Sequence, residues 1–286
     1  MSSKNARVPH PWLIGRRAAI ATKHGKEQQF GPPLQRRFGI NVEVADFDTD
    51  LLGTFTGTIA RTLSSHETAR RKAELAVQIT GCPIGLGSEG SFGSHPAIPF
   101  LPAAVETVVF LDVEHDVEIT ETLLTTNTNH SNLTVYEPVV PAEFLTRVGF
   151  PDHALIITAG DAVQPVATAV QDEVALQSAL RRCLEHAPAA VVTADLRAHL
   201  NPTRRQSIAE LAAQLVERLD RHCPACAAPG WGITAREAGM VCAECDTPTD
   251  LIAVDVWTCA SARCNHETRQ SRPGVAGPES CPFCNP

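Results

Sequence analysis

The chain has 286 residues, of which 43% are hydrophobic, so it can bury a sizeable core in one large domain or two smaller ones. Its formal net charge of -8 argues against a general nucleic-acid-binding protein, because such proteins need a positive surface. The apolar runs are strand-sized and no signal-like stretch opens the chain, so we expect a cytoplasmic protein without a membrane segment. Residues 1–40 are basic, which suits either a bound phosphate or pairing with the acidic body.

Strands and one long helix are predicted in the first half of the chain. Apolar and β-branched residues predict the strands, and a polar segment with a short helix separates the first two. The helix at 65–80 has alanines at helical spacing, and Ser65 can cap it. The predicted strands lie at 17–22, 40–47, 106–113 and 117–125.

The second half predicts further alternation, beginning with a short helix at 141–149. Asn201 can cap the last long helix, with Pro202 at its first position. We therefore predict an α/β fold, a mixed sheet flanked by helices, as one domain over residues 1–222. The remaining elements are strands at 153–159 and 189–195 and helices at 172–187 and 202–222.

The segment 85–93, GLGSEGSFG, contains glycines at 85, 87 and 90, which is the G-x-G-x-x-G spacing of a dinucleotide-binding turn. That turn must open a helix whose N-terminus faces the pyrophosphate. Pro96, Pro99 and Pro102 exclude such a helix here. We predict a glycine loop around Glu89 instead, in which the backbone can approach a ligand closely.

Cysteines define a second domain at residues 223–286, which holds eight of the ten cysteines in four close pairs. Such spacing in a reducing compartment predicts two structural zinc sites of four cysteines, a double zinc-ribbon. Sequential pairing, with the first two pairs on one zinc, is the simplest assignment, but the spacing also allows a cross-braced one. The pairs are Cys223 and Cys226, Cys242 and Cys245, Cys259 and Cys264, and Cys281 and Cys284.

Zinc held by four cysteines has no open coordination position, so neither centre is predicted to be catalytic. Zinc would replace a hydrophobic core that is too small to fold alone. A recognition role is the alternative, in which Trp231, Trp257 or Phe283 faces a protein partner. The acidic balance of this segment makes nucleic acid the less suitable partner.

A polar loop, TKHGKE, follows the first strand. Its hydroxyl, glycine and ammonium groups suit an anion, and a solvated turn is the alternative. Arg204 lies at a later strand-to-helix turn, and we expect it near the same ligand cleft. The loop residues predicted to bind substrate are Thr22, Lys23, His24 and Lys26.

Carboxylates gather in three further motifs: the acidic segment at 46–57, the helix start at Glu67 and the glycine segment at Glu89. Carboxylates at strand ends, opposite a lysine loop, are what a magnesium-dependent hydrolase of phosphoanhydrides requires. Salt bridges on a solvated face are the alternative for each motif taken alone. Asp46, Asp48 and Asp50 alternate in the first of these motifs.

The order of these motifs, ATKHGKE, DTDLLGTF, ETARRKA and EGSFG, resembles that in nucleotide pyrophosphatases of the inosine and xanthosine triphosphatase and Maf-like superfamily. The resemblance covers roughly residues 17–150. It implies that Thr22 and Lys26 contact phosphate. It also implies that Glu67 and Glu89 hold Mg²⁺ or activate water, and that Arg71 or Lys72 binds triphosphate. The whole chain also resembles an uncharacterised bacterial family with a zinc-binding tail.

These observations lead to two functional hypotheses. In the first, the protein is a Mg²⁺-dependent hydrolase of phosphoanhydride bonds in nucleotides, with Glu89, Glu67 and Lys26 as catalytic residues. In the second, it is a non-catalytic adaptor that binds a nucleotide or another anion and docks a protein partner through its zinc tail.

Overall fold

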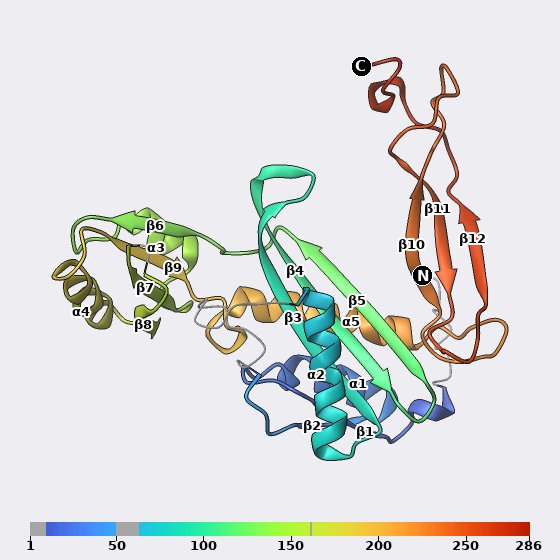
Figure 1. Ribbon diagram of the computed structural model, residues 1–286, viewed down its shortest axis with the longest axis horizontal. Coiled ribbons are helices and arrows are strands. Elements are labelled where there is room, and N and C mark those ends of the chain that lie inside the picture. Colours follow the sequence, from blue (N-terminus) through green and yellow to red (C-terminus); the bar gives the residue numbers. More distant parts are fainter. Residues whose placement is uncertain (1–9, 50–62, 161) are drawn as a thin grey trace, which may run out of the picture. The chain divides into compact units, whose positions relative to one another are not determined.

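The computed structural model describes residues 10–49, 63–160 and 162–286 (Figure 1). The chain divides into two compact units. The α/β unit comprises Leu13–Asp112 and Thr120–Val216. The cysteine unit comprises Val113–Ile119, Glu217–Pro286 and the described part of Met1–Trp12. A domain boundary after residue 222 remains a prediction.

The α/β unit is built on a five-stranded sheet with the order β2-β1-β3-β4-β5. β1 is parallel to both of its neighbours, whereas β3 and β4 are antiparallel, so the predicted mixed α/β fold is confirmed. The strands are β1 (Arg17–Ile20), β2 (Asn41–Val44), β3 (Ile84–His95), β4 (Ile98–Asp112) and β5 (Val117–Thr125).

The glycine segment at 85–93 is part of β3, so the prediction of a loop is wrong. The reason lies in the packing of helix α2 (Ser65–Thr80) on the sheet. A Cβ on Gly85 would overlap the backbone of Ala73, and a Cβ on Gly87 would overlap that of Ala69. These glycines therefore allow close approach of a helix to a strand rather than a turn.

Helix α2 begins and ends where the sequence predicts, but its cap is Ser64 rather than Ser65. The backbone N–H of Glu67 donates to Ser64 Oγ at 3.2 Å, and Ser64 N–H donates to Glu67 Oε2 at 2.9 Å. This capping box needs an extended residue at the cap, and Ser65 is already helical.

Helix α1 (Glu27–Phe38) is longer than the short helix predicted between β1 and β2, and it contains Pro32 and Pro33. Proline lacks the N–H that would reach the carbonyl four residues earlier. The carbonyls of Gln28 and Gln29 therefore lack the usual donor four residues ahead, although the helix continues because Phe30, Leu34 and Phe38 are buried.

A second, four-stranded sheet of the α/β unit has the order β6-β9-β7-β8, with antiparallel pairing throughout. Its core includes Leu155, Ile157, Leu176, Leu180 and Val192. Two of its strands were not predicted, because β6 is short and follows a polar segment and β8 begins at a proline. The elements are β6 (Asn132–Val135), α3 (Ala142–Val148), β7 (Leu155–Ala159), β8 (Pro165–Val170), α4 (Glu173–Leu184) and β9 (Ala190–Ala194).

Helix α5 (Pro202–Leu219) follows this sheet, and Asn201 caps it as predicted, accepting the N–H of Arg204 on Oδ1 at 2.9 Å. The cysteine unit contains a three-stranded antiparallel sheet of β10 (Gly232–Ala238), β11 (Ile252–Thr258) and β12 (Glu267–Ser271), drawn in orange and red in Figure 1. Across the described ranges, none of the helices is long and apolar enough to span a membrane.

Candidate functional site: two cysteine centres and a buried charge cluster

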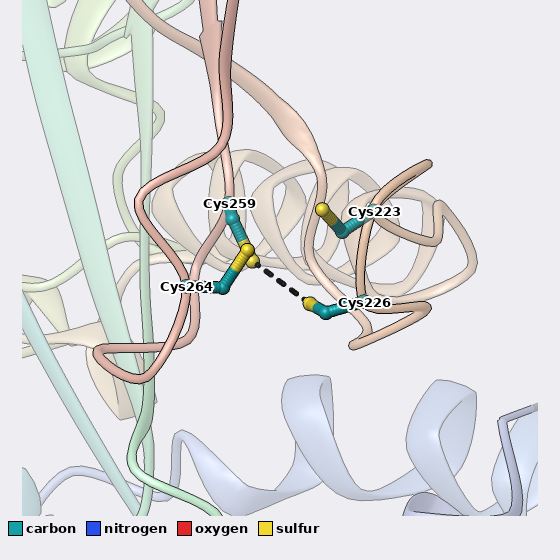
Figure 2. Close-up of side chains that lie close together, drawn as sticks. All are labelled: Cys223, Cys226, Cys259 and Cys264. Carbon is teal, nitrogen blue, oxygen red and sulfur yellow. Dashed lines mark hydrogen bonds between the residues drawn. The ribbon is translucent and has the colours of Figure 1, made fainter.

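The eight paired cysteines form two groups, and in each group the four sulfurs lie within 4.8 Å of one another. One group holds the first and third pairs, as Figure 2 shows, and the other holds the second and fourth. The sequential assignment is therefore wrong and the cross-braced one is correct. The groups are Cys223, Cys226, Cys259 and Cys264, and Cys242, Cys245, Cys281 and Cys284.

The antiparallel sheet explains why alternate pairs meet. One strand separates each cysteine pair from the next along the chain. Each strand carries the chain to the opposite end of the sheet, so the third pair returns to the first and the fourth to the second. A seven-residue strand spans about 23 Å, much farther than two ligands of one metal can be separated.

Both groups have the geometry of a zinc site. Tetrahedral zinc with Zn–S bonds of 2.3 Å places its sulfurs about 3.8 Å apart. The sulfurs of Cys226 and Cys259 are 3.6 Å apart, and those of Cys242 and Cys284 are 3.9 Å apart. These separations exceed the S–S bond of a disulfide, and all ten cysteines are free. Each group could therefore hold one structural zinc ion.

The first two pairs sit on similar tight loops. Cys223 N–H donates to Ala228 O at 2.8 Å, and Cys242 N–H donates to Thr247 O at 3.0 Å. In both loops the residue after the second cysteine, Ala227 or Asp246, has a positive φ. A hydrogen bond with Thr247 lowers the pKa of Cys245 to about 6, which favours the thiolate that zinc binds.

A second group of candidate site residues surrounds β3 in the α/β unit, where this strand extends beyond the end of β1. Leu86 O accepts a backbone hydrogen bond from Ala21, the residue that follows β1. Ser88 O is the next carbonyl on the same edge of β3, and Lys26 Nζ donates to it at 3.1 Å. The ammonium of Lys26 thus replaces the strand partner that β1 no longer supplies.

Glu89 and Lys72 form an ion pair, with Glu89 Oε2 and Lys72 Nζ 2.6 Å apart. Glu89 is 4% exposed and Lys72 is 8% exposed, so water screens the pair little. Lys72 belongs to α2, and Glu89 shares the face of β3 on which Gly85 and Gly87 contact that helix.

Arg204 and Glu106 form an ion pair on the opposite face of the sheet. Glu106 is directly opposite Gly90, which alternates with Glu89 along β3. Arg204 Nε donates to Glu106 Oε1 at 2.6 Å, and both side chains are buried. Sequence reasoning missed Glu106, although a lone carboxylate within the apolar run AAVETVVFL is a signal of a buried ion pair.

The pKa of Lys26 is lowered to about 7, and burial is the largest cause. Arg204 and Lys72 contribute to this lowering, whereas Glu106 and Glu89 oppose it. These five ionisable side chains therefore interact around β3, and we call them the charge cluster. Three are basic and two are acidic, so the cluster has one positive charge in excess when Lys26 is protonated.

The remaining predicted site residues are placed elsewhere in the α/β unit. Glu67 belongs to the capping box, and Arg71 donates to Glu74 Oε2 at 3.3 Å. Thr22 Oγ accepts the N–H of His24 at 3.2 Å, and the exposed Lys23 pairs with Asp48 at 3.0 Å. The structure thus joins Lys26, Lys72, Glu89 and Arg204, whereas Glu67 and Arg71 have local partners on α2.

Part of the predicted acidic segment, Asp50 and residues 51–57, lies outside the described residues.

A family profile described as "Domain of unknown function (DUF6671)" matches residues 72–286. A search of curated proteins and a search of solved structures each gave no match.

Proposed function

The chain belongs to the DUF6671 family, and we propose that its α/β unit binds a phosphate-bearing small molecule at the carboxyl end of β1. The observation that carries this proposal is the charge cluster, in which the ammonium of Lys26 interacts with two ion pairs on opposite faces of β3, Lys72–Glu89 and Arg204–Glu106. Holding a third cation in an interior with two anions is unfavourable unless it loses its proton or gains a counter-ion. A bound phosphate supplies that counter-ion.

The position of the cluster supports the same proposal. The chain leaves β1 for α1 and β2 on one side, and α2 then returns it to β3 on the other side. Such a reversal of strand order is where open α/β sheets bind ligands, beyond the carboxyl ends of their strands. Lys26 directly precedes α1, so its backbone belongs to the turn that begins this helix, while its ammonium reaches Ser88 of β3.

Titration calorimetry with pyrophosphate and the full-length, zinc-loaded protein tests this proposal. We expect saturable binding that Lys26→Met weakens at least tenfold. Methionine has a similar length and no charge, so it should keep the buried position filled. The matched control is Lys23→Met, in the same loop but exposed, which should change the affinity less than twofold. No binding to the folded wild-type protein, or equal losses in both variants, would overturn the proposal.

Hydrolysis of a phosphoanhydride bond is the second candidate, and the Glu89–Lys72 pair favours it. A phosphate that draws the ammonium of Lys72 away from Glu89 would leave a buried carboxylate. That carboxylate could hold Mg²⁺ or activate water. In this reaction Lys26 and Arg204 would stabilise negative charge on the phosphate oxygens.

A turnover assay separates hydrolysis from binding alone. Release of phosphate or pyrophosphate is measured with a panel of normal and deaminated nucleoside triphosphates and Mg²⁺. If the protein is a hydrolase, Glu89→Gln should lower turnover at least a hundredfold while pyrophosphate binding persists. Binding without turnover in the wild-type protein would reject the hydrolase and retain the anion-binding function.

If the protein is an adaptor, we propose that the cysteine unit binds a protein partner. All four ligand positions of each centre are cysteines, so zinc would be structural there. Phe283 is 74% exposed and could contact a protein partner. This role predicts that Phe283→Ser abolishes capture of such a partner and leaves both zinc ions bound. Unchanged capture would reject Phe283 as the contact.

A further inference from the structure

A groove of about 520 Å³ lies between α1 and α5 in the α/β unit. The residues that line it recur at helical spacing on one face of each helix, for example Gln28, Pro32 and Arg36 on α1, and Arg205 and Ala209 on α5. Its volume is in the range of small-molecule sites. Neither the charge cluster nor the cysteine centres contribute a lining residue.

The charge of the lining selects for an anion. Two guanidinium groups, those of Arg36 and Arg205, line the groove, and none of the described lining residues is a carboxylate. Arg205 is held in place because its Nη1 donates to the carbonyls of Ala198 and His199, at 3.1 and 3.0 Å. A planar guanidinium with further N–H groups can bind a carboxylate through two hydrogen bonds.

The side of the groove formed by α1 is suited to a different ligand group, one that donates hydrogen bonds. Pro32 and Pro33 supply no N–H to the carbonyls of Gln28 and Gln29 four residues earlier, and both glutamines line the groove. The side-chain oxygen of Gln29 is also buried and has no hydrogen-bond partner. Acceptors without donors are costly when they are shielded from water, and a ligand ammonium can donate to several of them.

Apolar lining completes the site. Ala209 and Ala213 of α5 and the two proline rings of α1 provide short, rigid apolar surface. Such surface accommodates the methylene groups between two polar ends of a ligand.

We propose that the groove between α1 and α5 binds a free acidic amino acid. Its carboxylates would pair with Arg36 and Arg205, and its ammonium would donate to the acceptors of Gln28 and Gln29. This site is separate from the proposed phosphate site, so the two proposals can fail independently.

Calorimetric titration of the full-length, zinc-loaded protein with L-glutamate tests the assignment. We expect saturable binding that Arg36→Gln weakens at least tenfold. Arg36 is exposed, so its replacement should leave the fold intact. The control is Arg37→Gln on the same helix, which is not among the lining residues and should change the affinity less than twofold.

A second probe and a second variant test the two walls separately. Glutarate has the two carboxylates of glutamate but no ammonium, so it should bind at least tenfold more weakly. Ala209→Trp should block both probes, because this exposed alanine lines the groove and a large side chain there would fill it. Absence of saturable glutamate binding, equal effects of the two arginine variants, or equal affinities for glutamate and glutarate would overturn the proposal. Binding of an acidic peptide without binding of free glutamate would do the same.

Discussion

Arg204 of α5 and Glu106 of β4 are joined by two hydrogen bonds, from Nε to Oε1 at 2.6 Å and from Nη2 to Oε2 at 3.2 Å. Gly90 is directly opposite Glu106 on β3, and a Cβ at Gly90 would overlap both side chains. Arg204 also donates through Nη1 to Leu196 O at 2.5 Å. One arginine thus ties α5 to β4 and to the end of the second sheet.

Replacing Arg204 with methionine should destabilise the α/β unit by about 3–5 kcal/mol, because Glu106 would be left fully buried without its partner. Urea unfolding followed by helical circular dichroism measures this loss, since most helical residues belong to the α/β unit. The double variant Arg204→Met with Glu106→Leu should recover most of the stability. A double variant that is less stable than Arg204→Met alone would contradict this account of the pair.

Gly87→Ala should lower the free energy of unfolding by about 3 kcal/mol or more, because the added methyl group would overlap the backbone of α2. Gly93 provides the control, since it lies on the same strand and a Cβ there would meet nothing within 4 Å. Gly93→Ala should change the stability by less than about 0.5 kcal/mol. Equal losses in the two variants would show that helix packing is not what selects glycine at position 87.

Lys26→Met should stabilise the protein most at low pH. Below about pH 7 both the folded and the unfolded chain carry the Lys26 proton, and the folded state bears the full cost of a buried charge. Between about 7 and 10.5 the unfolded chain keeps a proton that the folded chain has released, so the wild-type stability gains from rising pH. The advantage of the variant should therefore shrink by up to about 5 kcal/mol over this interval. Urea unfolding of both proteins at pH 6.5, 8 and 9.5 measures the trend. An advantage that grows with pH would refute it.

Zinc stoichiometry tests the interleaved pairing. Cys226→Ser with Cys264→Ser alters one centre and should leave one zinc ion per chain. Cys226→Ser with Cys245→Ser alters both centres and should leave none. Sequential pairing predicts the opposite result, with no zinc in the first double variant and one zinc ion in the second. Metal analysis after gel filtration distinguishes them, with the wild-type protein binding two ions.

Local patterns predicted the regular elements well. Helical spacing gave α2 with its observed ends, the strand predicted at 117–125 is β5, and the helix predicted at 172–187 is α4, which is shorter. The error at the cap was one residue, because Ser64 and Ser65 have the same chemistry and only the backbone conformation decides between them.

Tertiary contacts explain what the sequence alone did not show. The need for glycine at positions 85 and 87 follows from the close packing of α2 against β3. The burial of Glu106 is explained by its ion pair with Arg204, 98 residues later in the chain. The cysteine spacing predicted two four-cysteine centres, but their pairing depends on the strands between them. A prediction of one strand between each cysteine pair and the next would have indicated that the first pair meets the third and the second meets the fourth.

The most direct test of the proposed function is the pyrophosphate affinity of the wild-type and Lys26→Met proteins at pH 6 and at pH 8.5. The phosphate site proposed here needs a protonated Lys26, whose pKa is about 7 in the free protein. We therefore divide the dissociation constant of Lys26→Met by that of the wild-type protein. This ratio should be well above one at pH 6 and should be lower by roughly an order of magnitude at pH 8.5. Because the ratio compares two proteins, protonation of pyrophosphate itself cancels. A ratio that stays the same at both values, or a wild-type protein that binds no pyrophosphate at pH 6, would contradict the proposal.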